Sequence, residues 1–114
     1  MQLTIAQLAT FVSDCRRLRV NDEDLQALEA ILLDRPDAGA VIPGTGGFRK
    51  LPFAPPSAGR GKRGANRVIY AHFRQIEAVV LFLMYGKNEQ GNLTPAQKKA
   101  ALKWMTEFRR RLEE

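Results

Sequence analysis

The sequence predicts one α+β domain, in which a small twisted, mainly antiparallel sheet packs against an N-terminal helical pair and a C-terminal helix. Apolar residues recur at helical spacing in two segments before residue 36 and in one segment after residue 94. Three runs between them, 48–53, 66–73 and 78–85, have the composition of strands. A chain of 114 residues can bury a core of its own, so residues 1–114 are expected to form a single domain.

The N-terminal third predicts a short strand and two helices. Residues 2–6 fit the strand, and residues 7–17 fit a helix whose apolar stripe is Leu8, Phe11, Val12 and Cys15. A second helix is predicted to begin after Asn21, whose side chain can cap its free amides, and to end at Arg35, before Pro36. These helices are expected to form an antiparallel pair.

The middle of the chain predicts the sheet. Turn residues at 40–47 precede the first strand, the Gly/Pro-rich loop 54–65 leads to the second, and a tight turn at 74–77 leads to the third. The run from Val79 to Met84 is apolar on both faces, which is typical of a central strand that is covered on both sides.

The last helix has the clearest start signal in the chain. Thr94 is the predicted cap, Pro95 suits the first helical position, and Gln97 completes a capping box. The apolar stripe that should pack on the rest of the domain is Ala101, Trp104, Met105, Phe108 and Leu112.

Charge is distributed unevenly along the chain. Its net charge is +6, but residues 1–37 carry four arginines and seven acidic residues, a net charge of −3, so the remainder carries +9. Residues 39–76 hold seven cations and no acidic residue: Arg49, Lys50, Arg60, Lys62, Arg63, Arg67 and Arg74. This pattern predicts a surface that meets a polyanion, either a nucleic acid or an acidic protein. The alternative is a basic protein without such a partner.

The sequence lacks the residues that several kinds of chemistry need. Cys15 is the single cysteine and lies on an apolar stripe, so core packing is predicted for it. His72 is the single histidine, which leaves too few parts for a His-containing metal site or a Ser/His/Asp triad, and it is expected to be packed or at the rim. No metal or cofactor is therefore expected. No apolar run approaches the roughly 20 residues that span a bilayer, so the cytoplasm is the expected location.

Cation chemistry on a phosphodiester is what these residues can support. Arginine can bind the non-bridging oxygens of phosphorus while a base removes the proton of an RNA 2′-hydroxyl. On a regular strand Arg67 shares one face with Ile69, and Tyr70 points to the other. Lys50 on the neighbouring strand is the predicted companion of Arg67, although a charge at the edge of a sheet also serves to prevent aggregation.

Four segments together resemble one protein family: 41–50 (VIPGTGGFRK), 61–70 (GKRGANRVIY), 85–89 (YGKNE) and 93–97 (LTPAQ). In order and spacing they resemble the RelE/HigB superfamily of bacterial toxins, and most closely its HigB-like branch. The resemblance covers most of the chain and implies a RelE-like fold.

The resemblance also implies a function. Similar proteins are toxins of type II toxin–antitoxin systems, cleave mRNA in the ribosomal A site without a metal, and so inhibit translation. The positions carried over as catalytic are Lys50, Arg67 and Lys87. Those carried over as RNA- or ribosome-binding are Arg49, Arg60, Lys62, Arg63, Tyr70 and Asn88. The implied partners are the ribosome with its mRNA and a cognate antitoxin of helix-turn-helix type, through which alone the toxin would meet operator DNA.

This sequence departs from the family pattern at three places. Pro52 stands where a second basic residue is common, Asn88 stands where an arginine often follows the Gly-Lys pair, and Thr94 lies where some members have a tyrosine. The general base therefore has no clear identity. Lys50 and Lys87 are the candidates, and neighbouring cations would have to favour their neutral forms.

Two other interpretations stay open on the sequence alone. Tyr70 and Tyr85 can either stack on a base or pack inward in the core. The function can also differ while the fold stays the same: a ParE-like toxin that inhibits DNA gyrase by binding, or a nucleic-acid-binding regulator without catalysis. The cluster of Arg49, Lys50, Arg67 and Lys87 favours the nuclease.

Overall fold

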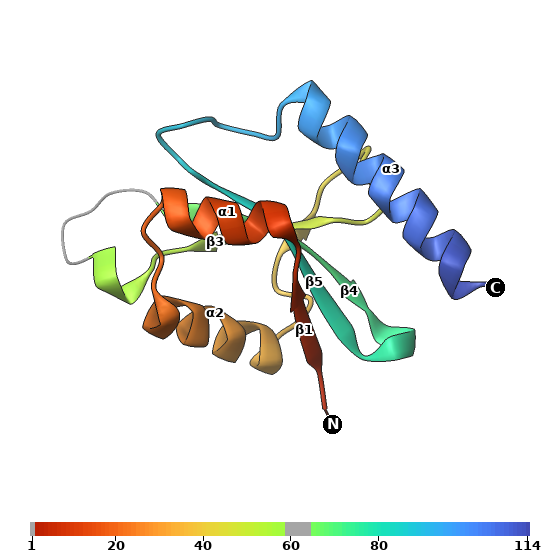
Figure 1. Cartoon of the computed structure of the whole chain (residues 1–114), viewed down its shortest axis with the longest axis horizontal. Helices are drawn as coiled ribbons and strands as arrows, with labels where there is room; N and C mark the ends of the chain where they lie inside the picture. Colours follow the sequence, from red (N-terminus) through yellow and green to blue (C-terminus); the bar gives the residue numbers. More distant parts are fainter. Residues whose placement is uncertain (1, 59–64) are drawn as a thin grey trace.

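The computed structural model describes residues 2–58 and 65–114 and has the predicted α+β class. Its five-stranded sheet has the order β1-β5-β4-β3-β2 (Figure 1). Strand β1 (Thr4–Gln7) pairs parallel with β5 (Ala78–Gly86), and the other three pairings are antiparallel. The sheet is therefore mixed and mainly antiparallel, with β5 and β4 (Asn66–Phe73) at its centre.

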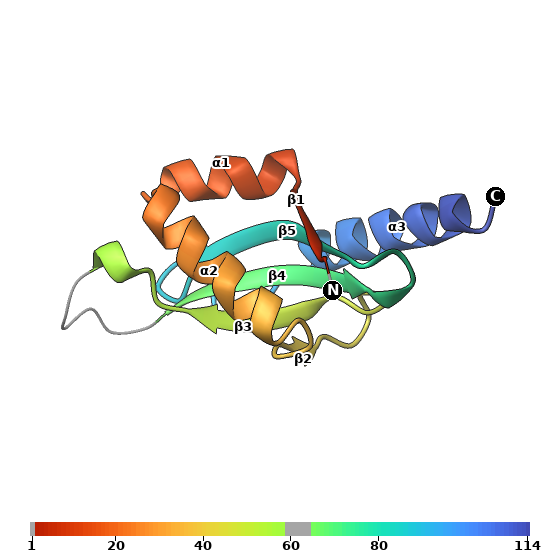
Figure 2. The ribbon, with the colours of Figure 1, turned by 90° about the horizontal axis from the view of Figure 1, so that it is seen from below.

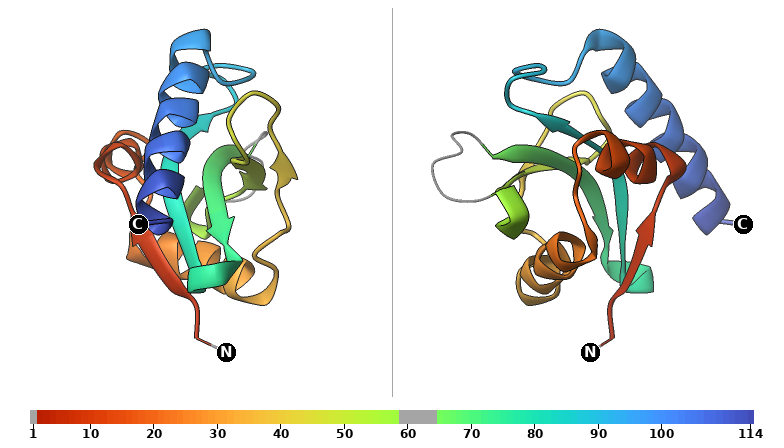
Figure 3. Two further views of the ribbon diagram at one scale, coloured as in Figure 1. Left: turned by 90° about the vertical axis from the view of Figure 1, so that its right-hand side faces the viewer. Right: turned by 60° about the vertical axis from the view of Figure 1, so that its left-hand side comes forward.

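Helices cover both faces of the sheet. Helix α1 (Ala9–Arg17) and helix α2 (Asp22–Asp34) lie on one face, and α3 (Pro95–Leu112) lies on the other (Figures 2 and 3). The two faces are called the α2 side and the α3 side below. The predicted helical pair and C-terminal helix are thus separated by the sheet, which gives the domain two cores.

The N-terminal elements begin and end close to their predicted positions. Strand β1 starts two residues later than predicted, and α1 starts at Ala9 because Leu8 has extended backbone angles and serves as its cap. Asn21 caps α2 as predicted: its side chain accepts from the Asp24 amide, and the Asp24 carboxylate accepts from the Asn21 amide. Asp24 also accepts hydrogen bonds from Ser57, which anchors the 3₁₀ turn Pro56–Ala58 on the start of α2.

Strand β2 (Ala40–Val41) was not predicted, because those two residues stand in a run of turn formers. It pairs with β3 (Arg49–Phe53), with Ala40 opposite Lys50. Gly39 makes the approach possible, since a Cβ there would come within 2.9 Å of the Tyr70 ring and 3.0 Å of the Lys50 carbonyl oxygen.

The three long strands match their predictions closely. Strand β4 has the predicted bounds, and the predicted tight turn is a 3₁₀ turn, Arg74–Ile76, that ends on Glu77 in the left-handed region at φ 49°. One irregularity lies between β4 and β5, where Ile69 is opposite Leu83 but Tyr70 is opposite Leu81. Phe82 is an extra residue of β5 at this point, and as a result two consecutive residues, Phe82 and Leu83, face the α3 side.

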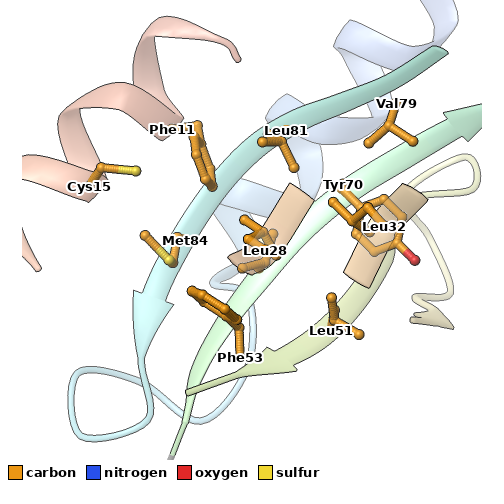
Figure 4. Close-up of a cluster of buried hydrophobic side chains, with 11 residues drawn as sticks. Phe11, Cys15, Leu28, Leu32, Leu51, Phe53, Tyr70, Val79, Leu81 and Met84 are labelled. Atoms are coloured by element: carbon orange, nitrogen blue, oxygen red, sulfur yellow. The ribbon is translucent and has the colours of Figure 1, made fainter. Parts of the chain in front are cut away.

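The α2-side core forms between the sheet and the N-terminal helices (Figure 4). Phe11, Leu28 and Leu32 are fully buried in it. Cys15 is 5% exposed, as the prediction of core packing requires, and burial raises the pKa of its thiol to about 11. Such a thiol stays protonated near neutral pH, so it behaves as a small apolar side chain.

The α3-side core forms beneath α3, which begins at the predicted capping box of Thr94 and Gln97. Ala101 and Met105 are fully buried against the sheet, and Trp104 stacks on Phe108 with ring centroids 4.8 Å apart. Leu112 is 39% exposed, so the apolar stripe ends one turn before its predicted last member.

Candidate functional site

Two of the predicted catalytic residues lie diagonally across neighbouring strands on the α3 side. Lys50 of β3 is opposite Ile69, and Arg67 of β4 precedes Ile69 by two residues. Because Ile69 belongs to the α3-side core, both cations point to that side of the sheet. Diagonal neighbours of this kind have their Cβ atoms roughly 7–8 Å apart. The structure thus places Arg67 and its predicted companion Lys50 on one side of the sheet.

Lys87 lies at the same end of the sheet. Gly86 ends β5 opposite Asn66, so Lys87 leaves the sheet beside the start of β4, in which Arg67 is the second residue. Its side chain is exposed, whereas Lys50 and Arg67 are half-buried. Lys50 and Arg67, which point to the α3 side, and Lys87 in the turn that follows β5 are together called the α3-side cation row below. Asn88 follows Lys87 in the same exposed turn.

Neutral oxygen atoms are the partners of the two half-buried cations. Lys50 Nζ donates to Asn92 Oδ1 at 3.4 Å, and Arg67 Nη1 donates to the Ala65 carbonyl at 3.0 Å. Within residues 2–58 and 65–114, no member of the α3-side cation row forms an ion pair. Their full charges therefore face whatever approaches this end of the sheet.

The turn that carries Lys87 is held by α1. Arg17 donates from Nε and Nη2 to the two carboxylate oxygens of Glu89 at 2.8 and 3.0 Å, and Glu89 Oε1 also accepts from the Gly86 amide at 2.7 Å. Asp14 completes the junction by pairing with Arg17 and by accepting from the Met84 amide at 2.9 Å. The Arg17 hydrogen bonds hold the pKa of Glu89 below its ordinary value, so the pair is charged at neutral pH.

A second network sets the position of Asn92. Gln90 Nε2 donates to the Asn92 carbonyl at 2.8 Å and to Gln97 Oε1 at 2.7 Å, and Gln97 is part of the cap of α3. The segment between β5 and α3 is thereby tied to the helix start. Its Asn92 side chain lies beside Lys50, whose strand is 42 residues away in sequence.

Sequence reasoning missed Arg17, Glu89 and Asn92. Arg17 and Glu89 are 72 residues apart, so no local pattern relates them. One available signal was that Glu89 is one of only five acidic residues after residue 37 and directly follows the Lys87 turn.

The structure contradicts the assignment of Tyr70 as an RNA-binding residue. Tyr70 faces the α2 side and has no exposed surface. Its hydroxyl donates to the Pro36 carbonyl at 2.8 Å and accepts from the Gly39 amide at 2.9 Å. Tyr70 is a core residue that fastens the segment after α2, and it cannot reach a nucleic acid.

Arg49 also lies on the opposite side from Lys50, which corrects its grouping with the RNA-binding cations. Its guanidinium donates to the carbonyls of Asp37 and Gly39 at 3.1 and 2.8 Å, and its Nη2 lies 3.6 Å from the Asp37 carboxylate. Consecutive strand residues point to opposite faces, so Arg49 and Lys50 cannot share a surface.

Asp37 is the centre of a charged cluster on this α2 side. Arg74 Nη2 lies 2.7 Å from one carboxylate oxygen, and His72 Nδ1 lies 2.7 Å from the other. The hydrogen bonds from Arg74 and His72, with the charge of Arg49, hold the pKa of Asp37 at about 2. Asp37, Arg49, His72 and Arg74 are called the Asp37 cluster below. The one carboxylate offsets part of the charge of the two arginines, and the His72 side chain is packed with 9% of its surface exposed, one of the two predicted placements.

The remaining predicted residues of the basic loop, Arg60, Lys62 and Arg63, lie outside the described residues. In the described part of the chain, no group of three or more His, Cys, Asp or Glu side chains is arranged to hold a metal ion. No helix in this part is long and apolar enough to cross a membrane.

Comparison with known proteins gives limited information. No family model matches the chain. Among solved structures, a metal-bound toxin from Helicobacter pylori is similar at 18% sequence identity and a TM-score of 0.40, and the match covers 77% of this chain and 98% of that one. Structural similarity at this level says nothing about the chemistry of this chain. The RelE/HigB resemblance therefore stays a prediction from the sequence motifs.

Proposed function

We propose that this chain is the toxin of a type II toxin–antitoxin pair and a metal-independent endoribonuclease that cleaves mRNA on the ribosome. The observation that carries the proposal is the α3-side cation row, whose charges have no carboxylate partner among the described residues. Three cations from three separate segments, two of which lie diagonally on one face of the sheet, suit the non-bridging oxygens and developing negative charge of a phosphodiester under attack.

Arg67 is the proposed phosphate ligand. Its fork of N–H donors can bind two non-bridging oxygens at once. The guanidinium now donates to the neutral Ala65 carbonyl oxygen, and a charged phosphate oxygen is a stronger acceptor that would displace it. Lys50 lies diagonally beside it and supplies a second charge to the same phosphate, while Asn92 keeps the Lys50 ammonium in place.

The reaction needs no atom from outside the RNA and the protein. The 2′-oxygen attacks the adjacent phosphorus, the bond from phosphorus to the 5′-oxygen of the next nucleotide breaks, and a cyclic phosphate forms. The proton of the 2′-hydroxyl passes to a neutral lysine amine, that of Lys87 when Lys50 binds the phosphate as an ammonium, or that of Lys50 in the reverse arrangement. The departing 5′-oxygen takes its proton from the lysine that is then the ammonium.

The ribosome is the proposed source of substrate positioning. A row of cations stabilises charge but does not by itself align the 2′-oxygen with the bond that breaks, and alignment is worth several orders of magnitude in rate. Exposed Lys98, Lys99 and Lys103 on the outer surface of α3 suit contact with rRNA phosphates. Activity on free RNA is accordingly expected to be weak.

The proposed partner that restrains the toxin is an antitoxin of helix-turn-helix type. Negative charge from such a partner on the α3-side cation row would compete directly with RNA phosphate. Operator DNA would then be bound through the antitoxin.

Primer extension on mRNA after induced expression tests the proposal. The wild type is expected to produce new mRNA ends within translated codons, and Arg67→Ala is expected to remove them while the protein stays folded. Arg74→Ala is the matched control, because it deletes the same side chain from the turn that follows β4 and should leave the mRNA ends unchanged. Equal cleavage by Arg67→Ala and wild type would contradict the role of Arg67.

The same induction distinguishes the alternative functions. Intact mRNA with an SOS response would indicate gyrase inhibition, and normal growth would indicate the non-catalytic regulator.

A further inference from the structure

Tyr85 has a buried hydroxyl that the fold does not satisfy. The residue is 1% exposed, and its hydroxyl has no hydrogen-bond partner among the protein atoms of residues 2–58 and 65–114. Buried polar groups are nearly always paired, because an unpaired one loses its bonds to water without replacement. Tyr70, the other tyrosine, obeys that rule with two hydrogen bonds.

The position of Tyr85 relates this hydroxyl to the candidate site. Tyr85 of β5 is directly opposite Arg67 of β4, and directly paired residues project from the same face of the sheet with Cβ atoms roughly 5 Å apart. The charge of Arg67 acts on the phenol and favours its ionised form. Burial opposes ionisation more strongly and raises the pKa above its ordinary value, so at neutral pH the hydroxyl carries its proton and can donate.

An anion is the acceptor that suits this hydroxyl. The Arg67 guanidinium is near enough for its charge to act on the Tyr85 hydroxyl, so it selects negative charge and offers N–H donors to a ligand bound there. A phosphate group has enough oxygens to accept from both side chains at once. We propose that Arg67 and Tyr85 form one binding site for a phosphodiester of RNA, in which the tyrosine hydroxyl donates to a phosphate oxygen held by the guanidinium.

This assignment rests on the proposed function and makes Tyr85 a catalytic residue of the same site. It also supplies an uncharged donor beside the Arg67 guanidinium. Because the hydroxyl is covered, the phosphate reaches it only when a neighbouring side chain moves. The Arg67 side chain is half-buried and its described hydrogen bond is to the Ala65 carbonyl, just before its strand.

A pair of identical substitutions on opposite faces of the sheet tests the assignment. Tyr85→Phe removes an unpaired hydroxyl and is expected to keep or raise the melting temperature, while it lowers the single-turnover cleavage rate on programmed ribosomes by about 10²-fold, the effect of losing one transition-state donor. Tyr70→Phe removes two hydrogen bonds and is expected to lower the melting temperature while the folded protein cleaves at the wild-type rate. If Tyr85 had a purely structural role, Tyr85→Phe would not lower the cleavage rate while the melting temperature is kept.

A binding measurement separates this inference from the proposed reaction. The probe is a short oligoribonucleotide that is methylated at its 2′-oxygens and so cannot be cleaved. Tyr85→Phe is expected to bind it about 10- to 150-fold more weakly than the wild type, the range for one hydrogen bond to a charged group, and Tyr70→Phe is expected to match the wild type. If the wild type cleaves no mRNA but Tyr85→Phe still weakens binding, the reaction is overturned and the phosphate contact stands. If the wild type cleaves mRNA and Tyr85→Phe cleaves and binds equally well, the Tyr85 assignment is overturned and the reaction stands. Absence of both cleavage and binding by the wild type overturns both.

Discussion

Strands β3 and β4 contribute cations both to the α3-side cation row and to the Asp37 cluster, but the two sets of charges have opposite kinds of partner. Arg49 and Lys50 are consecutive in β3, yet Arg49 binds a carboxylate and two carbonyls on the α2 side, whereas Lys50 meets the Asn92 amide on the α3 side. Arg67 and Arg74 differ in the same way within and just after β4. A run of cations in a sequence is therefore not one surface. The strand separates it into charges that fix the fold and charges that stay available to a ligand.

Charge reversal at Lys50 should give the largest effect. Lys50→Glu places an anion diagonally beside Arg67, where it both repels phosphate and occupies the guanidinium, so cleavage on programmed ribosomes should fall roughly 10³-fold. Arg74→Glu makes the same reversal beside Asp37, outside the proposed site, and the folded variant should cleave near the wild-type rate. Similar losses in the two variants would show that net charge matters and the α3-side cation row does not.

Loosening the Lys87 turn should give an intermediate effect. Glu89→Gln removes the charge that Arg17 binds, and the resulting displacement of Lys87 should lower the cleavage rate about 10-fold, since rates depend steeply on ångström-scale position. Thermal denaturation should change little, because exposed ion pairs stabilise proteins weakly.

The matched control for that turn is Glu107→Gln. It removes another exposed ion pair, with Arg110 at 3.1 Å, from the outer surface of α3. Equal rates for Glu89→Gln and the wild type would mean that the position of Lys87 is irrelevant to the chemistry.

Removing the centre of the Asp37 cluster should alter stability and leave the cleavage rate of the folded protein unchanged. Asp37→Asn should lower the free energy of unfolding by about 1 kcal/mol at pH 7, a small value because the carboxylate is partly solvated. The folded-state pKa of about 2 lies below the value of about 4 for an unfolded aspartate, so this contribution is present above pH 4 and is lost as the pH falls toward 2. Urea unfolding of both proteins at pH 7, 4 and 2 measures it. A difference that grows as the pH falls would contradict the assignment.

The sequence predicted those parts of the fold that depend on local patterns. The caps at Asn21 and Thr94, the bounds of β4 and the turn ending at Glu77 are set by residues within a few positions of each other. Strand β2 could not be predicted in this way, because its two residues become a strand only by pairing with β3. The parallel β1–β5 pairing was likewise beyond a local pattern, as it joins strands separated by most of the chain.

The candidate site was predictable to the same extent. Strand alternation was enough to place Arg67 with Ile69 and away from Tyr70, and the observed register adds Lys50 to the same side. Alternation does not reveal what covers each face, so the burial of Tyr70 beneath the segment after α2 was missed. Arg17 and Asn92 were missed because they reach the site through contacts 72 and 42 residues apart in sequence.

The most direct test of the comparison is an NMR titration with the 2′-O-methylated oligoribonucleotide, following the backbone amides and the side-chain signals of lysine and arginine. The proposed function predicts shift changes at Lys50, Arg67 and Lys87, with Arg49 and Arg74 unchanged. Changes confined to Arg49, His72 and Arg74, with the α3-side cation row unaffected, would contradict it.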